Sequence, residues 1–189
     1  MAKLSVKPLF ALFLLALAAL TRLLPHPANF APMTAMALFS GAMVSPFLMS
    51  LLLFLGSLWL SDLLVNNLLF HEFFGRFVFF YDGFYWQYLS YLLISLWGRI
   101  AIRKFAFYPI IGSLLSSSVL FFLLSNFGVW LLGKLYPLTL EGLVQCYIAA
   151  LPFFRNALLG DLTYGALLFG AVGLAYKSSK RESFLAGQG

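Results

Sequence analysis

Charged residues are scarce in this sequence. Asp, Glu, Lys and Arg make up only 10% of the 189 residues, whereas 62% are hydrophobic. A soluble domain carries about 25% charged residues, because most of its residues touch water. The composition therefore excludes an ordinary soluble domain and predicts a protein whose solvent is lipid.

Residues that build metal and nucleotide sites are also few. Cys146 is the only cysteine, which excludes a disulfide framework and a cysteine-based metal site. The two histidines, His26 and His71, lie far apart, without the HExxH spacing of a zinc protease. No Walker motif is present, so an ATP-driven role needs a separate ATPase. We expect no cofactor and no metal.

What the chain has instead is a series of long apolar runs. A bilayer core about 30 Å thick needs about 20 helical residues, and helices satisfy their own backbone hydrogen bonds in lipid. The sequence predicts an all-α membrane protein, a single domain over residues 1–189. Its six transmembrane helices are expected at residues 8–24, 30–44, 47–70, 84–97, 108–132 and 153–176.

The remaining segments are more polar. Residues 136–152 are too short and too polar to span a membrane comfortably, so we expect a re-entrant or interfacial helix there. Residues 177–189 are predicted to be a polar cytoplasmic tail. Pro25, Pro27 and Pro32 stiffen the loop between the first two spans.

The basic residues predict the orientation. The net charge is +6, but Lys and Arg lie in short clusters between apolar runs, which indicates membrane topology and no nucleic-acid partner. With both termini inside the cell, the predicted inside set has eight basic residues and the outside set four. The inside set is Lys3, Lys7, Arg99, Arg103, Lys104, Lys177, Lys180 and Arg181, and the outside set is Arg22, Arg76, Lys134 and Arg155. An N-terminal signal peptide is the competing interpretation, but its removal would leave an odd number of spans.

Polar residues inside the predicted spans are the candidates for function, because a charge at the centre of a lipid-exposed helix costs about 2.5–3.5 kcal/mol. Asp62 and Asn66 share a helical face, which indicates either the wall of a ligand cavity or a helix end that reaches water. Asp161 lies six residues after Arg155, so the two do not share a face. We expect Asp161 to find its partner on another helix and Arg155 to extend to the membrane surface.

Three other positions leave two interpretations open. Asn126 can bond a ligand or bridge helices. Trp130 and Tyr136 suit the interfacial aromatic belt or an aromatic wall beside a flat ligand. Arg22 and His26 lie in the proline-rich outer loop, where they can form a pocket rim or simply be solvated.

Small residues four apart also mark packing surfaces. Gly112 with Ser116, and Ala166 with Gly170, have the small-xxx-small spacing that lets helices pack closely. We expect these positions to lie inside the bundle.

Several strings together resemble an uncharacterised bacterial membrane family, which is similar to the substrate-binding (S) subunits of energy-coupling-factor vitamin transporters. The strings that carry this resemblance are residues 22–32, Ser61-Asp62, residues 125–130 and residues 136–161. The resemblance implies a six-helix bundle with both termini cytoplasmic and a micronutrient pocket near the outer face. The residues that it implies for binding are Asp62, Asn126, Arg155, Asn156, Asp161 and those of the 22–32 loop, among them Arg22, His26 and Asn29. The predicted site also includes Trp130 and Tyr136, as the candidate aromatic wall.

The predicted function is therefore a substrate-capture subunit for a small heterocyclic or anionic nutrient in a bacterial inner membrane. A transmembrane coupling protein and ATPases are the expected partners. However, the alanines of the first span show no i, i+4 pair of the kind with which S subunits dock on that protein. One alternative is an intramembrane enzyme that uses Asp62, Asp161 and His26 for acid–base chemistry. The other is a scaffold protein without a ligand.

Overall fold

The computed structural model describes the backbone of residues 6–186 and the side chains of residues 6–178. All regular structure in this part of the chain is helical. The elements are α1 (Pro8–Leu20), the 3-10 turn η1 (Thr21–Leu23), α2 (Met33–Met43), α3 (Phe47–Leu64), the π-helical turn η2 (Val65–Leu69), α4 (His71–Phe74), α5 (Phe84–Ala101), α6 (Phe107–Leu131) and α7 (Leu140–Ala186).

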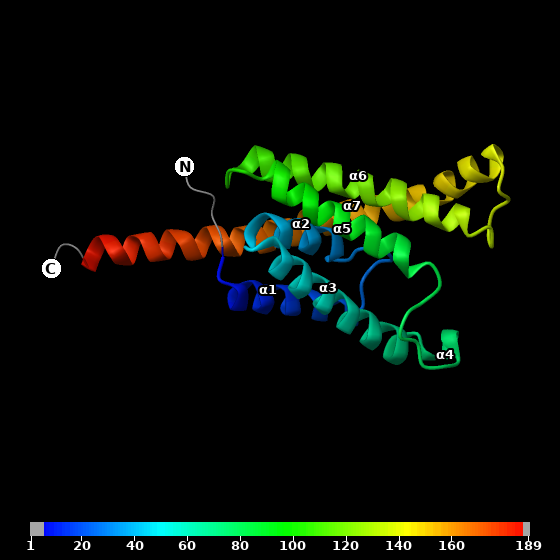
Figure 1. Cartoon of the computed structure of the whole chain (residues 1–189), viewed down its shortest axis with the longest axis horizontal. Coiled ribbons are helices and arrows are strands. Elements are labelled where there is room, and N and C mark those ends of the chain that lie inside the picture. The colour runs from blue at the N-terminus through cyan, green and yellow to red at the C-terminus, as the bar shows by residue number, and fades with distance from the viewer. Residues whose placement is uncertain (1–5, 187–189) are drawn as a thin grey trace.

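The six longer helices alternate in direction, so α1 begins and α7 ends at the same end of the molecule (Figure 1). We call this the terminal end and the opposite one, where α6 ends and α7 begins, the distal end. Val6 N donates to Met43 O over 2.9 Å at the terminal end. Arg99 Nη1 donates to Val44 O over 3.1 Å there, which ties α5 to the end of α2.

Three helices are long and apolar enough to cross a membrane by length and composition. They are α3 continued through η2 (Phe47–Leu69), α6 (Phe107–Leu131) and most of α7 (Leu140–Ser178). At about 1.5 Å per residue, α6 is about 37 Å long, which exceeds a hydrocarbon core of about 30 Å. The helices α1, α2 and α5 fall short of this standard, so three of the six predicted spans are supported by length and composition.

Helix α2 is the central element of the bundle. It has 11 residues, all of them buried, and it packs against α3, α5, α6 and α7. Glycines allow the closest approach, since a Cβ at Gly41 would overlap the backbone oxygen of Ser95 and one at Gly98 that of Leu38. Ser95 Oγ also donates to Ala37 O over 3.0 Å. A helix this short, about 16 Å, begins and ends within the protein.

The prediction of a separate re-entrant or interfacial helix at residues 136–152 is wrong. Helix α7 runs without interruption from Leu140 to Ala186, with Pro152 inside it and most of the predicted tail in its last turns. A proline removes one backbone hydrogen bond, but contacts with α6 hold the first part of α7 in place. Tyr147 Oη donates to Leu123 O over 2.7 Å, and Cys146 Sγ lies 3.4 Å from Asn126 O.

The predicted small-residue packing is also wrong at two positions. A Cβ added at Gly112 or Gly170 would meet nothing within 4 Å, so both glycines lie on open faces of their helices. Close contact occurs at Gly165 instead, where a Cβ would reach 2.7 Å from Leu114 Cδ2. The spacing rule does not distinguish the face toward the bundle from the face toward lipid.

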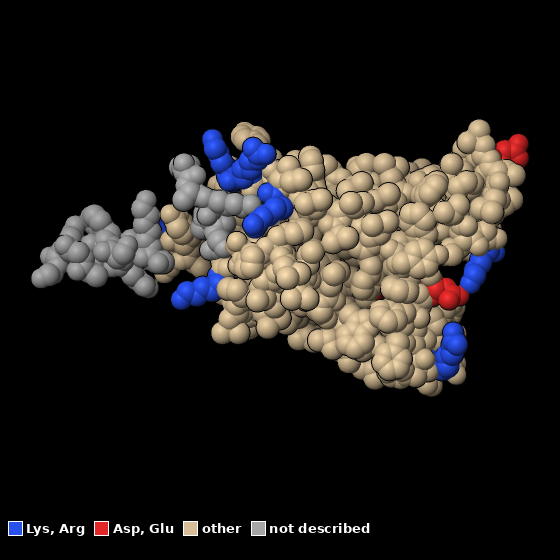
Figure 2. All heavy atoms as spheres, viewed as in Figure 1, with Lys and Arg blue, Asp and Glu red and all other residues tan. Residues whose placement is uncertain are grey.

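The charged side chains are concentrated at the two ends. Lys and Arg gather at the terminal end, acidic and basic residues both occur at the distal end, and the face between them is almost entirely uncharged (Figure 2). Lys3, Lys180 and Arg181, which belong to the predicted inside set, lie outside the described side chains. Large apolar side chains such as Leu52, Leu123 and Leu167 are exposed on α3, α6 and α7. This distribution is typical of a protein whose middle is surrounded by lipid.

Candidate functional site

A pocket of about 320 Å³ lies in the distal half of the bundle, between the start of α2, the start of α5, the second half of α6 and the middle of α7. Its polar lining comes from Arg22, Asn29, Thr34, Asp82, Gln87, Ser118, Ser125, Asn126 and Asp161. Its aromatic lining comes from Trp86, Tyr91, Phe121, Phe122, Phe153 and Phe154. Mixed linings of this kind are typical of small-molecule sites, which occupy about 300–1,000 Å³.

Asp161 is the acidic group of this pocket. Its side chain is 2% exposed, and Ser118 Oγ from α6 donates to its Oδ2 over 2.6 Å. The Thr34 side chain and the backbone N–H of Ala35 also interact with the carboxyl group. Because α2 begins inside the protein, its first N–H groups have no helical partner, and a carboxylate there compensates them. The expectation that Asp161 finds its partner on another helix is confirmed.

One face of α7 holds the loop that closes the pocket toward the distal end. Asn156 Nδ2 donates to Ala28 O over 3.0 Å. One turn later a Cβ at Gly160 would lie 3.0 Å from Ala31 N, so the absence of a side chain there favours this close approach of the loop. After another turn Tyr164 packs against Phe30, with ring centroids 5.8 Å apart. Two segments that carry the family resemblance, residues 22–32 and 136–161, thus meet at the pocket.

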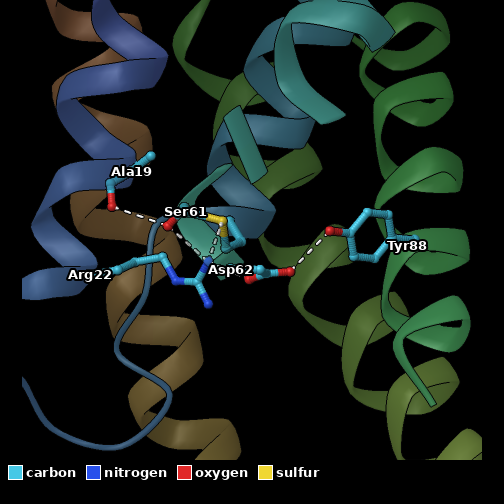
Figure 3. Close-up of polar contacts among 6 residues, drawn as sticks. Ala19, Arg22, Ser61, Asp62 and Tyr88 are labelled. Atoms are coloured by element: carbon cyan, nitrogen blue, oxygen red, sulfur yellow. Dashed lines mark hydrogen bonds and ion pairs between the residues drawn. The ribbon is translucent and has the colours of Figure 1, made fainter. Parts of the chain in front are cut away.

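Arg22 and Asp62 form a buried ion pair beside the pocket. Arg22 Nη1 lies 2.7 Å from Asp62 Oδ1, and Tyr88 Oη donates to Asp62 Oδ2 over 3.1 Å (Figure 3). Arg22 also donates to Ser61 Oγ over 3.0 Å. The Arg22 and Asp62 side chains are 19% and 6% exposed. This network joins the end of α1 to α3 and α5, and it compensates the charge of Arg22, which lines the pocket.

The aromatic side of the pocket depends on one glycine. A Cβ at Gly128 of α6 would overlap the Trp86 ring, so glycine allows the indole to lie against α6. Across the pocket, Tyr91 and Phe121 stack with centroids 4.9 Å apart and an interplanar angle of 14°. The result is a set of flat apolar surfaces that suit a planar ligand.

A second ion pair lies at the rim. Lys134 Nζ, after α6, lies 2.6 Å from Asp82 Oδ2, before α5. The hydrogen bond from Lys134 lowers the pKa of the Asp82 carboxyl below its usual value. Both side chains are well exposed, so this contact closes the rim only weakly.

Asn67 fixes the segment between α3 and α5, a role that sequence reasoning missed. Its Nδ2 donates to Val78 O over 2.9 Å, and its Oδ1 accepts from Val78 N over 2.7 Å. The amide thereby satisfies both backbone groups of a buried residue, as a neighbouring strand would. Asn66, which the helical spacing favoured, falls in the π-helical turn, and its Nδ2 has no partner among the described residues.

Of the ten predicted site residues, four line the pocket: Arg22, Asn29, Asn126 and Asp161. Asn126 lies on α6 and donates through Nδ2 to Phe122 O over 2.8 Å. Asn29 has φ 62°, in the left-handed region that asparagine tolerates better than most residues.

The other six lie around the pocket or away from it. Asp62 is outside the lining and pairs with Arg22, and Asn156 bonds the loop at Ala28 O. His26 is exposed, with Nδ1 2.9 Å from Pro27 O. Trp130 Nε1 donates to Pro137 O over 3.0 Å at the distal end. The last two, which are outside the lining, are the half-buried Tyr136 and the exposed Arg155.

Several lining residues were not predicted. Thr34, Trp86, Gln87 and Ser118 lie in apolar runs, where hydropathy marks only a span. Serine and glutamine are ordinary in such helices, and only the three-dimensional arrangement aims them at one cavity. The packing of Trp86 against Gly128 on another helix leaves no local sequence signal.

The geometry bears on the two alternatives to ligand capture. Among Asp62, Asp161 and His26, only Asp161 lines the pocket. Acid–base catalysis by two of them needs both at one substrate position, which this arrangement does not provide. No group of three or more His, Cys, Asp or Glu among the described residues could hold a metal ion. A fully collapsed interior, which is expected of a ligand-free scaffold, is not observed, because the pocket of about 320 Å³ is present.

Comparison with known families gives one match. A model of a family of unknown function, DUF6580, covers residues 2–183. The chain belongs to this family. The match covers the pocket and all of the long helices except the last three residues of α7, so the predicted membership of an uncharacterised family is confirmed. No curated protein and no solved structure matched the chain.

Proposed function

We propose that this member of DUF6580 is a substrate-binding membrane subunit for the uptake of a small micronutrient, similar to the S subunits of energy-coupling-factor transporters. The observation that carries the proposal is the pocket of about 320 Å³, with aromatic walls and convergent polar groups, inside an apolar helical bundle. A volume of this size suits a single-ring or two-ring heterocycle.

The orientation in this proposal places the pocket outward, in a multi-pass protein of the bacterial inner membrane. The terminal end carries the basic residues Lys7, Arg99, Arg103, Lys104 and Lys177. Basic segments stay in the cytoplasm by the positive-inside rule. The distal end and its pocket then face the outside.

The loop at residues 24–32 is the proposed entry gate. It is held to α7 by Asn156 and by Tyr164, contacts that a modest movement can break and remake. The proposed inward release is driven by ATP. Because the chain has no nucleotide-binding motif of its own, separate ATPases must supply this energy. A transmembrane coupling protein with ATPases is the proposed partner.

The test compares small molecules that remain bound to purified protein. Wild type, purified from bacterial membranes in mild detergent, is extracted and analysed by mass spectrometry beside two variants of α7. Ala157→Phe fills the pocket, and Ala149→Phe is the matched control on an exposed position of the same helix. We expect at least one compound in wild type and Ala149→Phe that Ala157→Phe lacks. Equal extracts from all three proteins would reject the proposal.

A further inference from the structure

The charges around the pocket do not balance. Two of the three charged residues in its lining have partners, since Arg22 pairs with Asp62 over 2.7 Å and Asp82 with Lys134 over 2.6 Å. Asp161 has only neutral partners, and no described Lys or Arg lies within 4 Å of its carboxylate. The lining and its ion-pair partners therefore carry one uncompensated acidic group.

Asp161 is also the most enclosed of these charged groups. It is 2% exposed, whereas Asp82 is at the open rim. A buried carboxylate loses its hydration, and neutral hydrogen-bond donors replace only part of it. The positive end of α2 contributes about half an elementary charge. The site therefore favours a further positive group beside the carboxylate.

Ser118 leaves room for such a group. Its one hydroxyl hydrogen has two acceptors within reach, Asp161 Oδ2 at 2.6 Å and Leu114 O at 3.0 Å. When a ligand N–H takes over the carboxylate oxygen, the serine hydroxyl can turn to the backbone oxygen without losing a hydrogen bond. The carboxyl group can thus change partners without leaving a buried donor unsatisfied.

The walls above Asp161 suit the same ligand. Trp86, Tyr91, Phe121 and Phe122 line the cavity. The faces of aromatic rings attract cations, and indole does so most strongly. Among the described residues no group of three or more His, Cys, Asp or Glu could hold a metal ion, so a buried carboxylate among aromatic rings favours an organic cation.

We propose that the pocket binds a small organic cation, either a protonated amine or a positively charged nitrogen heterocycle, with Asp161 as its counter-ion. This inference rests on the proposed function and replaces the anionic nutrient that the sequence left open. Arg22 does not select an anion, because Asp62 already holds its guanidinium.

The test uses a defined mixture. A low-molecular-weight bacterial extract is separated at pH 7 on a cation exchanger into a bound, cationic fraction and an unbound fraction of neutral and anionic compounds. Each fraction is incubated with purified wild-type protein, the protein is recovered by gel filtration, and the retained compounds are identified by mass spectrometry. The proteins compared are wild type, Asp161→Asn, Ser118→Ala, Ala157→Phe and the control Glu141→Gln, which removes an exposed acidic group at the distal end outside the lining.

We expect wild type and Glu141→Gln to retain a compound from the cationic fraction alone. Asp161→Asn should bind it at least about thirtyfold more weakly, the effect of removing one partner of a buried charge pair. Ser118→Ala, which keeps the carboxylate, should bind it with a smaller loss than Asp161→Asn.

Each other outcome has a definite meaning. Retention only from the unbound fraction overturns the cation while leaving the proposed function intact, and so does equal retention by a folded Asp161→Asn. If wild type retains nothing beyond Ala157→Phe from either fraction, the proposed function itself fails. Wild type alone distinguishes the charge class, so the test does not depend on the folding of any variant.

Discussion

Ser118 and Asp161 lie 43 residues apart in the chain and 2.6 Å apart in the structure, with the serine hydroxyl donating to the carboxylate. This contact joins α6 to α7 at the pocket and places an acidic group at the start of α2. Together with the contacts of Asp161 to Thr34 and Ala35 of α2, this hydrogen bond links three elements that have no sequence motif in common.

Loss of this hydrogen bond should be measurable as stability. Ser118→Ala leaves one oxygen of a buried carboxylate without its donor, and we expect the free energy of unfolding to fall by about 1.5–3 kcal/mol. Thr163→Ala, which removes an exposed hydroxyl that donates to Leu159 O of its own helix, should change it by less than about 0.5 kcal/mol. Thermal or SDS unfolding in detergent measures both. Equal effects would show that the hydrogen bond between Ser118 and Asp161 does not stabilise the fold.

The ion pair of Arg22 with Asp62 should behave as a unit. Arg22→Met strands a buried carboxylate, and since the arginine is 19% exposed we expect a loss near the lower end of about 3–5 kcal/mol. The double variant Arg22→Met with Asp62→Asn should recover more than half of it, because the amide can still bond Tyr88. A double-mutant cycle measures the coupling. Additive losses would contradict the pairing.

Adjacent asparagines provide a matched comparison. Asn67→Ala removes both hydrogen bonds to Val78, so we expect faster proteolysis and faster amide exchange in residues 70–83. Asn66→Ala removes a buried amide nitrogen that has no partner among the described residues, and should leave that segment unchanged. Hydrogen-exchange mass spectrometry on both variants shows which of the two asparagines holds residues 70–83 in place. Loosening of the segment by Asn66→Ala alone would reverse the assignment.

The rim pair predicts a dependence on pH. Lys134 lowers the pKa of Asp82 in the folded protein, so the stabilisation is present above the carboxyl's unfolded pKa of about 3.9 and is lost as pH falls through the folded value. Wild type should therefore melt slightly higher than Asp82→Asn at pH 6, and the difference should vanish at strongly acidic pH and in high salt. A difference that grows toward low pH would have the wrong sign.

Parts of the fold could be predicted because apolar runs are long and their ends are marked. The predicted segment 47–70 corresponds to α3 with η2, and 108–132 to α6, within one residue at each end. The prediction failed at residues 136–152, because polarity and Pro152 indicate a break locally. Contacts with α6, which no local pattern reports, keep α7 continuous.

The site was predictable only in part, for a related reason. A buried acidic residue such as Asp161 can be identified from the sequence, because a charge in an apolar run is energetically costly. Its partner Ser118 cannot be identified in this way, because serine is common in such runs. The pairing of Arg22 with Asp62 was equally hidden, since the two residues are 40 apart and hydropathy says nothing of which helices are neighbours.

Accessibility of the pocket from one side of the membrane tests the central claim most directly. Cys146→Ser removes the only native thiol, and Ser125→Cys places a new one in the pocket lining. A membrane-impermeant cationic thiol reagent is then applied to right-side-out and to inverted membrane vesicles. The account predicts labelling in right-side-out vesicles, blocked by adding Ala157→Phe and unaffected by Ala149→Phe. Labelling in inverted vesicles alone, or labelling that Ala157→Phe does not change, would contradict an outward-facing binding pocket.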